Sequence, residues 1–542
     1  MALDINIADV CQALAAAYPA RECLVFRDRR LTWAAIDDRT RRLGAVLNAE
    51  GAGRLRPFIG SAEWESTQRH VALYLHNGNE YLEGMLGAYA AGWAPVNINY
   101  RYRADELAYV LGDSRSEVVV VHSTFAPLLA EVLPRLPDVR LVLQVDDESG
   151  NPLIEEAQWY EQALAGADPA TCPGAGERSG DDLYICYTGG TTGMPKGVLW
   201  RQADFVVSAL GVRRRDGSDF GAIDEIVAAA EQSTLRALPA PPLMHGAAHW
   251  NALSCWISGG TVIIQDRPDR LDPVDIWSTV ERQRATSLLI VGDSFARPLL
   301  DELGRHRYDL SSLRHLLSGG AVLSAHAKAE LLDAVSGLTI VDVLGSSESG
   351  RQGVASTRST DDLGAGFVRS STARVVREDL TGTLEAGTGE IGWLTQTGRV
   401  PLGYLNDREK TERTFPIIDG QRHAVAGDRA RLGADGSVEL LGRDSVCINT
   451  GGEKVFAEEV EVVLTSHPAV HDAVVCGRPS ERWGQEVVAV VSLSEPVDTS
   501  VLIEHCRERL APFKAPKAVV VVDAVVRSPS GKADYRWARA QV

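Results

Sequence analysis

The chain has few cysteines, no C-x-x-C pair and no long apolar run. Its eight cysteines are scattered over 542 residues and several lie inside apolar stretches, which is typical of reduced, buried thiols in a cytoplasmic protein. The longest apolar run, 518–526, contains Asp523. It falls short of the roughly 20 apolar residues that span a membrane, so we expect a buried strand there. Residues 1–21 contain two aspartates and no sustained apolar core, which argues against a signal peptide.

Positive charge is also in deficit. The chain has 55 Lys and Arg against 73 Asp and Glu, a formal net charge of −18. Nucleic acids and anionic membranes require a basic face, so we expect neither as a partner. A small anionic ligand is not excluded, because a local cleft needs only a few positive groups. With 45% apolar and 24% charged residues, the composition predicts a globular chain with a large domain and a smaller one.

The most informative stretch is the run 187–197, which combines glycines, threonines and one lysine. Glycines let backbone N–H groups face an anion, hydroxyls add donors, and Lys196 supplies positive charge. Apolar, β-prone residues flank the run, so we expect a short connection between buried strands rather than a flexible linker. No Gly-Lys-Ser/Thr follows a glycine at the spacing of a Walker loop. The run therefore predicts a polyphosphate site formed by Thr188, Gly189, Gly190, Thr191, Thr192, Gly193 and Lys196.

Strand and helix patterns alternate over most of the chain, which predicts an α/β fold with parallel sheets covered by helices. Strand, helix and strand patterns follow one another at 71–75, 80–91 and 94–98, and again at 238–243, 249–258 and 261–265. Further strands are expected at 287–291, 313–317 and 338–344. Residues 53–70 and 213–234 look inserted, and we assign them no function.

From about residue 382 the pattern changes to short β-like pieces, which predict a small β-rich subdomain. The last segment has the size of a separate α+β domain. Its helices are expected at 455–464 and 499–510, and its strands at 473–476, 487–493 and 519–522. We therefore predict a large domain over 1–443 and a small mobile domain over 444–542.

The run 187–197 resembles the signature loop of the adenylate-forming superfamily, which includes acyl-CoA synthetases, adenylation domains of peptide synthetases and luciferases. The next motif, Gly345-Ser346-Ser347-Glu348, resembles the family's Tyr-Gly-x-Thr-Glu. The resemblance implies that Ser346 and Ser347 contact the nucleotide and that Glu348 binds Mg²⁺, which suits a single carboxylate beside phosphate oxygens. Leu344 replaces the usual aromatic residue, so apolar contact is expected in place of stacking on adenine.

The same resemblance implies the rest of the nucleotide site. Gly320 and Ala321 resemble the backbone segment that flanks the base. Asp342 lies where the family often binds the adenine amino group, although a strand-end cap is an equal alternative. Asp428 is expected to accept hydrogen bonds from the ribose hydroxyls, and Arg443 to reach the ribose or the α-phosphate.

Three further roles are implied in the C-terminal segment. Asp444 resembles the hinge about which the small domain turns. Gly451 and Gly452 resemble the loop that lines the pantetheine tunnel of coenzyme A. Lys532, in a Pro-Ser-Gly-Lys match, is expected to bridge the substrate carboxylate and the α-phosphate during adenylation.

The run 242–250 resembles the acyl-pocket motif of bacterial long-chain acyl-CoA synthetases. His245 is expected to face the reacting carboxyl group. Gly246 and Gly320 would leave volume for the acyl group, and Trp250 would gate its tunnel, with ordinary core packing as the alternative for Trp250.

These motifs follow the family's order from 187 to 532, so the resemblance covers essentially the whole chain. It implies an acyl-CoA synthetase that uses ATP, Mg²⁺ and coenzyme A. The motifs look like those of actinobacterial ligases of long-chain or steroid side-chain acids, so a bulky hydrophobic acid (long-chain, steroid or terpenoid) is expected. Two alternatives stay open: a stand-alone module that loads a carrier protein, and, since Leu344 and Ala426 depart from the pattern, an enzyme mainly of the thioesterification step. A homodimer is also left open.

Overall fold

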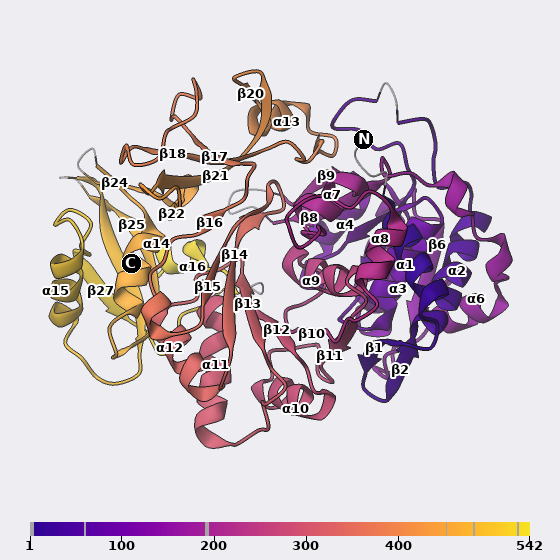
Figure 1. Cartoon of the computed structure of the whole chain (residues 1–542), viewed down its shortest axis with the longest axis horizontal. Helices are drawn as coiled ribbons and strands as arrows, with labels where there is room; N and C mark the ends of the chain where they lie inside the picture. Colours follow the sequence, from indigo (N-terminus) through magenta and orange to yellow (C-terminus); the bar gives the residue numbers. More distant parts are fainter. Residues whose placement is uncertain (1–4, 59–60, 190–193, 451–452, 481–482, 528–530) are drawn as a thin grey trace. The chain divides into compact units, whose positions relative to one another are not determined.

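The computed structural model in Figure 1 describes the chain except for residues 1–4, 59–60, 190–193, 451–452, 481–482 and 528–530. The chain divides into two compact units. Unit 1 comprises Met1–Leu289, Ser347–Gly350 and Arg399–Pro416, and unit 2 comprises Ile290–Ser346, Arg351–Gly398 and Ile417–Val542. The boundary expected at 443/444 falls inside unit 2 and stays a prediction. Among the helices of the described residues, none is both long enough and apolar enough to cross a membrane.

Unit 1 contains an eight-stranded sheet whose central strands are parallel, as the alternating pattern predicts. Its order is β19 (Gly403–Tyr404), β9 (Lys196–Arg201), β8 (Leu183–Thr188), β4 (Ala94–Asn97), β3 (His70–Tyr74), β5 (Ser116–His122), β6 (Leu141–Val145) and β7 (Gln158–Trp159). Every residue of β3, β4 and β6 is buried, as expected for strands covered on both faces.

A second run of paired strands in unit 1 is β12 (Ser287–Ile290), β10 (Arg236–Pro239), β11 (Thr261–Ile264), β1 (Glu22–Phe26) and β2 (Arg29–Thr32). Helices connect and cover the strands of this unit. They are α1 (Ile7–Ala17), α2 (Trp33–Ala49), α3 (Asn79–Ala90), α4 (Ala104–Asp113), α5 (Ala126–Val132), α6 (Tyr160–Gly166), α7 (Gln202–Ser208), α8 (Ile223–Ala229), α9 (Gly246–Ile257), α10 (Pro273–Gln283) and α13 (Arg408–Thr414).

Unit 2 contains the paired strands β13 (His315–Gly319), β14 (Thr339–Ser346), β15 (Gly350–Thr357) and β16 (Val368–Arg369), with helices α11 (Gly292–Arg305) and α12 (Ala325–Ala334). It also contains the expected small β-rich sheet, formed by β17 (Ala373–Val376), β18 (Ile391–Thr397), β20 (Ile417–Ile418), β21 (Gln421–Leu432) and β22 (Val438–Arg443).

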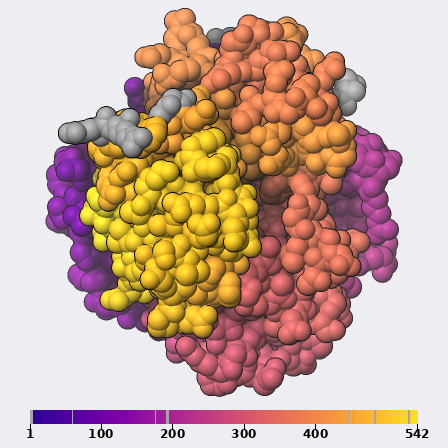
Figure 2. Space-filling view, turned by 90° about the vertical axis from the view of Figure 1, so that its left-hand side faces the viewer, coloured from indigo at the N-terminus to yellow at the C-terminus, as the bar shows by residue number. Residues whose placement is uncertain are grey.

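The C-terminal segment of unit 2 is an α+β structure, seen as a rounded yellow surface in Figure 2. Its sheet is formed by β23 (Ile448–Thr450), β24 (Glu453–Val455), β25 (Val470–Ser480), β26 (Gly484–Leu493) and β27 (Ala518–Val521). Its helices are α14 (Ala457–Thr465), α15 (Thr499–Arg509) and α16 (Tyr535–Arg539). The predicted fold class is therefore confirmed: α/β layers, a small β-rich sheet and a smaller α+β segment.

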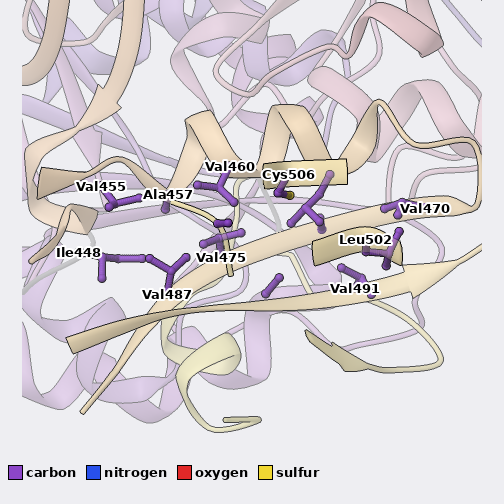
Figure 3. Close-up of a cluster of buried hydrophobic side chains, with 14 residues drawn as sticks. Ile448, Val455, Ala457, Val460, Val470, Val475, Val487, Val491, Leu502 and Cys506 are labelled. Carbon is purple, nitrogen blue, oxygen red and sulfur yellow. The ribbon is translucent and has the colours of Figure 1, made fainter. Parts of the chain in front are cut away.

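Residues along β25 and β26 alternate between two cores, because successive side chains of a strand point to opposite faces. Ala473 and Val475 join the core shown in Figure 3, together with residues of α14 and α15. Val474 and Cys476, between and beside them, pack in a second core that includes Ala538 of α16. The C-terminal sheet is therefore covered by helices on both faces.

Most expected elements are present, and the shifts at their ends have local causes. The buried strand expected at 518–526 is a correction: β27 covers only Ala518–Val521 and is half-buried to exposed, because it pairs with β26 alone at the edge of its sheet. Helix α9 begins at Gly246, three residues before the expected start, because the extended backbone of His245 (φ −98°, ψ 139°) serves as its N-cap. Helix α14 begins at Ala457, later than expected, because Glu453–Val455 pairs with β23 as strand β24. The apparent insertion 213–234 contains α8, which packs against α1.

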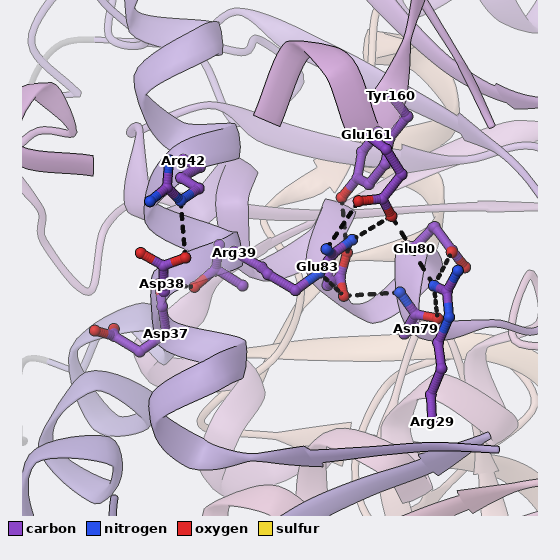
Figure 4. A network of polar contacts seen from close by, with 11 residues as sticks. Arg29, Asp37, Asp38, Arg39, Arg42, Asn79, Glu80, Glu83, Tyr160 and Glu161 are labelled. Carbon is purple, nitrogen blue, oxygen red and sulfur yellow. Dashed lines mark hydrogen bonds and ion pairs between the residues drawn. The ribbon is translucent and has the colours of Figure 1, made fainter. Parts of the chain in front are cut away.

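A buried ionic network joins α2, α3 and α6, as Figure 4 shows. The Glu83 side chain is 0% exposed, and its two carboxylate oxygens accept hydrogen bonds from Arg39 at 2.7 and 3.0 Å. Asn79 and Tyr160 donate to the same carboxylate at 2.8 and 2.9 Å. Because its partners satisfy both oxygens, the charge is tolerated in the core.

We predict that Arg39→Met will lower the free energy of unfolding by about 3–5 kcal/mol, because it leaves the buried Glu83 charge without its cation. Arg135→Met is the control: it removes an exposed arginine that pairs with Asp105 at 2.9 Å, and should cost about 0–1 kcal/mol. Urea unfolding of the two variants measures the difference. Equal losses would show that the network contributes no more than a surface ion pair.

Candidate active site

The β8–β9 hairpin positions the predicted phosphate loop. The two strands pair antiparallel, and Thr188 lies opposite Lys196 at the loop end of the hairpin. The expected connection between buried strands is confirmed. Thr188 and Lys196 are thus held at the two ends of the loop, next to Gly189. Gly190, Thr191, Thr192 and Gly193 lie outside the described residues, so their part in the site stays a prediction.

Tyr404 connects Lys196 to Glu348 in unit 1. The Lys196 ammonium lies 5.1 Å from the centre of the Tyr404 ring, and the Tyr404 hydroxyl donates a hydrogen bond to Glu348 Oε1 at 3.0 Å. Strand β19 places this tyrosine, because Tyr404 pairs with Val198 of β9. Trp200 of β9 also donates from Nε1 to the Ser347 carbonyl at 2.9 Å. Backbone and side-chain bonds to β9 therefore bring the predicted lysine and carboxylate together.

A second lysine belongs to this cluster. Burial and the adjacent Lys410 ammonium lower the pKa of Lys196 to about 8, while Glu348 and Asp407 act in the opposite direction. The cluster thus holds two cations and two carboxylates, and it fits the phosphates of a nucleotide with their metal ion.

The predicted acyl motif forms the start of α9, and a chain of hydrogen bonds holds its tryptophan. His249 Nδ1 lies 2.7 Å from the Leu243 carbonyl, so Nδ1 carries the proton and donates it. Nε2 of the neutral ring then accepts from the Tyr184 hydroxyl. The same hydroxyl accepts from Trp250 Nε1 at 2.6 Å. Burial lowers the pKa of His249 to about 4, which keeps the ring neutral in this arrangement.

Trp250 is therefore a fixed, half-buried side chain. Its ring meets Phe205 edge to face at 5.5 Å between centroids, and a Cβ at Gly246 would lie 3.4 Å from its indole. Half-buried His245 precedes it as the N-cap of α9. Both alternatives for Trp250 remain compatible with this position, because the indole is packed on one side and partly exposed.

In unit 2 the structure brings Lys532 beside Gly320. A Cβ added at Gly320 would lie 3.8 Å from Lys532 Cε. Gly320 and Ala321 follow β13, whose Ser318 pairs with Asp342 of β14.

Asp342 forms an ion pair with Lys328 at 2.6 Å. Burial raises the pKa of Asp342, and the Lys328 ammonium opposes the shift. Ser346 ends β14, and Leu344 packs in the core of the small β-rich sheet.

Asp428 and Arg443 pair directly on strands β21 and β22. Arg443 Nε donates to Asp428 Oδ1 at 3.1 Å, so these two predicted ribose contacts lie together.

Asp444, the predicted hinge, follows at the start of a short 3₁₀ turn, and its carbonyl accepts from Cys447 N at 3.1 Å. Thr450 pairs with Glu453 at the ends of β23 and β24. Gly451 and Gly452, between them, lie outside the described residues.

Tyr184, His249, Lys328, Tyr404 and Lys410 are the residues that sequence reasoning missed. Tyr404 and Lys410 stand in the run 401–410, which we matched to no motif. Tyr184 looks like any aromatic residue of a buried strand. His249 is part of the acyl motif, but nothing in its spacing indicates that it contacts Tyr184.

Comparison with known proteins identifies the family of the chain. Residues 11–404 match the family described as AMP-binding enzyme, and residues 459–532 match the AMP-binding enzyme C-terminal domain. The chain is 48% identical to the medium-chain acyl-CoA ligase Mig of Mycobacterium avium, over 98% of this chain and 97% of that protein. It is 37% identical to the 3-oxocholest-4-en-26-oate–CoA ligase of Rhodococcus rhodochrous, over 99% and 96% of the two chains.

The fold is similar to that of the anthranilate CoA ligase AuaEII in complex with anthranoyl-AMP. The TM-score is 0.80 at 23% identity, over 100% of this chain and 98% of that one. The expected resemblance to adenylate-forming enzymes is confirmed by the matched family and the full-length relatives. The chain belongs to the AMP-binding enzyme family.

Proposed function

We propose that this protein is an AMP-forming acyl-CoA ligase that activates a hydrophobic carboxylic acid with ATP and transfers it to coenzyme A. The observation that carries the proposal is the placement of Lys196 and Glu348 on either side of Tyr404, at the end of the predicted phosphate loop. Full-length relatives described as acyl-CoA ligases support the same reaction. We also propose a cytoplasmic location, since the eight cysteines, all among the described residues, form no disulfide.

In the first step a carboxylate oxygen of the acid attacks the α-phosphorus of ATP. The bond from that phosphorus to the bridging oxygen breaks, giving acyl-AMP and pyrophosphate. Thr188 and Lys196 would bind the departing phosphates. Lys532 would stabilise the charge that develops between the carboxylate and the α-phosphate. Asp428 and Arg443 would bind the ribose, and Asp342 with the Gly320–Ala321 backbone would lie near the base.

Glu348 fits the role of magnesium ligand. The described contact of its carboxylate is the Tyr404 bond to Oε1, which leaves Oε2 for a cation. Mg²⁺ commonly binds one or two carboxylates together with phosphate oxygens and water. When bound, the ion would neutralise part of the phosphate charge.

In the second step the thiolate of coenzyme A attacks the acyl carbonyl carbon, and AMP leaves with the electrons of the anhydride bond. We propose that the segment 444–542 turns about Asp444 between the steps, because adenylation requires Lys532 and thioesterification requires the loop with Gly451 and Gly452. His245 would lie near the acyl carboxyl group in both steps. This activation converts a poor acyl donor into a mixed anhydride before thiolysis.

We propose a medium-chain, long-chain or polycyclic acid as substrate. The relatives' described activities, on medium-chain acids and on a steroid acid, support this class. Trp250 would form one wall of the acyl site, held in place by Tyr184 and His249. A panel of such acids, assayed for AMP release with and without coenzyme A, tests the function. Acid-dependent AMP release that is the same without coenzyme A would contradict the ligase activity.

Lys532→Ala should slow acyl-AMP formation by about 10²-fold or more, because it removes a preorganised charge from the reaction. Thioester formation from pre-formed acyl-AMP should persist. Pyrophosphate exchange and single-turnover thioesterification measure the two steps separately. Lys517→Ala, which removes an exposed lysine from the same segment, should affect neither. Equal loss in both steps would contradict the role of Lys532 in adenylation alone.

Glu348→Gln should raise the Mg²⁺ concentration needed for half-maximal rate and lower kcat, because it keeps the shape but removes the charge. Tyr404→Phe should give a smaller shift in the same direction, since the carboxylate remains but loses its hydrogen bond. Glu409→Gln, at an exposed position of α13, is the control. If Glu348→Gln leaves the magnesium requirement unchanged, Glu348 is not the magnesium ligand.

Tyr184→Phe should change acid selectivity, because it removes the hydroxyl that holds Trp250 and satisfies His249. We expect the ratio of kcat/KM between bulky and short acids to change by about fivefold or more, about 1 kcal/mol. Trp250→Phe should change the same ratio, and the double variant should be non-additive. Tyr89→Phe is the control: Tyr89 is equally buried, and its hydroxyl has no hydrogen-bond partner among the described residues. If Tyr184→Phe leaves the selectivity ratio unchanged, Trp250 does not form part of the acyl site.

A further inference from the structure

Lys410 is placed beside Lys196 by the fold rather than by the flexibility of a surface side chain. The Tyr404 backbone N–H donates to Thr411 Oγ1 at 2.9 Å, which fixes α13 to β19. Strand β19 pairs in turn with β9, the strand that begins at Lys196. Backbone pairing and one short helix therefore hold Lys410 close to Lys196, at the end of the predicted phosphate loop, and Lys410 acts on the pKa of Lys196.

This arrangement has an electrostatic cost, because like charges at short range repel each other. The carboxylates of Asp407 and Glu348 offset this repulsion only in part. Asp407 Oδ2 lies 3.9 Å from Lys410 Nζ, while its Oδ1 accepts the Lys410 backbone N–H at 3.0 Å. Glu348 is held by Tyr404. The Lys410 side chain is 29% exposed, so solvent screens it only in part.

We propose that Lys196 and Lys410 together bind the pyrophosphate group, both as the β- and γ-phosphates of ATP and as the product that leaves. A multiply charged phosphate oxyanion between two ammonium groups turns their repulsion into two charge-assisted contacts. This inference rests on the proposed ATP-dependent reaction. It adds a cation, Lys410, that none of the sequence motifs contains.

The pair accounts for two requirements of the first step at once. Binding through two lysines would orient the leaving group for in-line displacement, and the positive charge would stabilise the negative charge that the leaving oxygen gains. The mutual repulsion of the lysines would also reappear as pyrophosphate departs, since the bridging anion is then gone. That repulsion keeps the two side chains apart and ready for the next nucleotide.

The experiment compares Lys410→Met, Lys410→Arg and Arg413→Met in the full chain. Arg413→Met removes the same charge from α13 at an exposed position whose partner, Glu409, is 3.9 Å away. Calorimetric titration with inorganic pyrophosphate, without magnesium, gives the affinity. Loss of one charge-assisted contact should weaken binding about tenfold in Lys410→Met. Lys410→Arg should bind nearly as the parent chain does, and Arg413→Met should be unchanged.

Thermal unfolding distinguishes this role from a structural one. Without pyrophosphate, Lys410→Met should unfold at a higher temperature than the parent chain, and the gain should shrink at high salt, because the repulsion is relieved. A lysine that merely supports the fold would give the opposite shift. Weaker binding together with higher stability supports the proposal. Unchanged pyrophosphate affinity in Lys410→Met, or affinity lost equally in Arg413→Met, overturns it.

Steady-state assays separate this inference from the proposed function. If Lys410→Met keeps the parental KM for ATP while the parent chain releases AMP in an acid-dependent manner, Lys410 is not a phosphate ligand and the ligase activity stands. If the parent chain neither binds pyrophosphate nor releases AMP with any acid of the panel, both the inference and the proposed function are wrong.

Discussion

The hydrogen bond from Tyr404 to Glu348 holds a carboxylate near Lys196 without neutralising it. An arginine in place of Tyr404 would form an ion pair and occupy the carboxylate. A neutral hydroxyl orients the group and leaves its charge for a cation. Because Tyr404 also lies under the Lys196 ammonium, one side chain sets the positions of the positive and negative groups together. The chemistry proposed for this site depends on that separation of charges.

The contrast with the network around Glu83 shows how a structural ionic cluster differs from a binding one. Around Glu83, Arg39 forms two hydrogen bonds and two neutral groups complete the shell, so the carboxylate is saturated within the protein. Around Lys196, two ammonium groups adjoin each other and their carboxylates make few contacts with them. A saturated cluster stabilises the fold, whereas an unbalanced one has most to gain from an added anion.

Much of the fold could be predicted because apolar periodicity and glycine positions are local properties of the chain. The β8–β9 hairpin and both β-α-β units were expected within a few residues of their observed ends. Tyr404 and Lys410 could not be found in this way, because their position depends on β19, a two-residue strand whose Gly403 and Tyr404 pair with Leu199 and Val198 of β9, far away in the sequence. For Asp342 the sequence left two roles open, and its ion pair with Lys328 depends on helix α12, whose packing no local pattern specifies.

The approach of Lys532 to Gly320 shows how backbone geometry can set the position of a reactive side chain. Gly531 has φ +78°, and a Cβ there would lie 2.4 Å from Ser294 Oγ, so only glycine lets the chain lie against this wall. Arg527 forms a β-bridge with Ala533 and donates to Asp472 of β25 at 2.8 Å, which anchors it to the C-terminal sheet. Gly320, at φ +86°, completes the arrangement from the opposite side. Gly531 therefore removes the Cβ that would clash with this wall, and the Arg527–Asp472 pair anchors the backbone nearby, so Lys532 can approach Gly320.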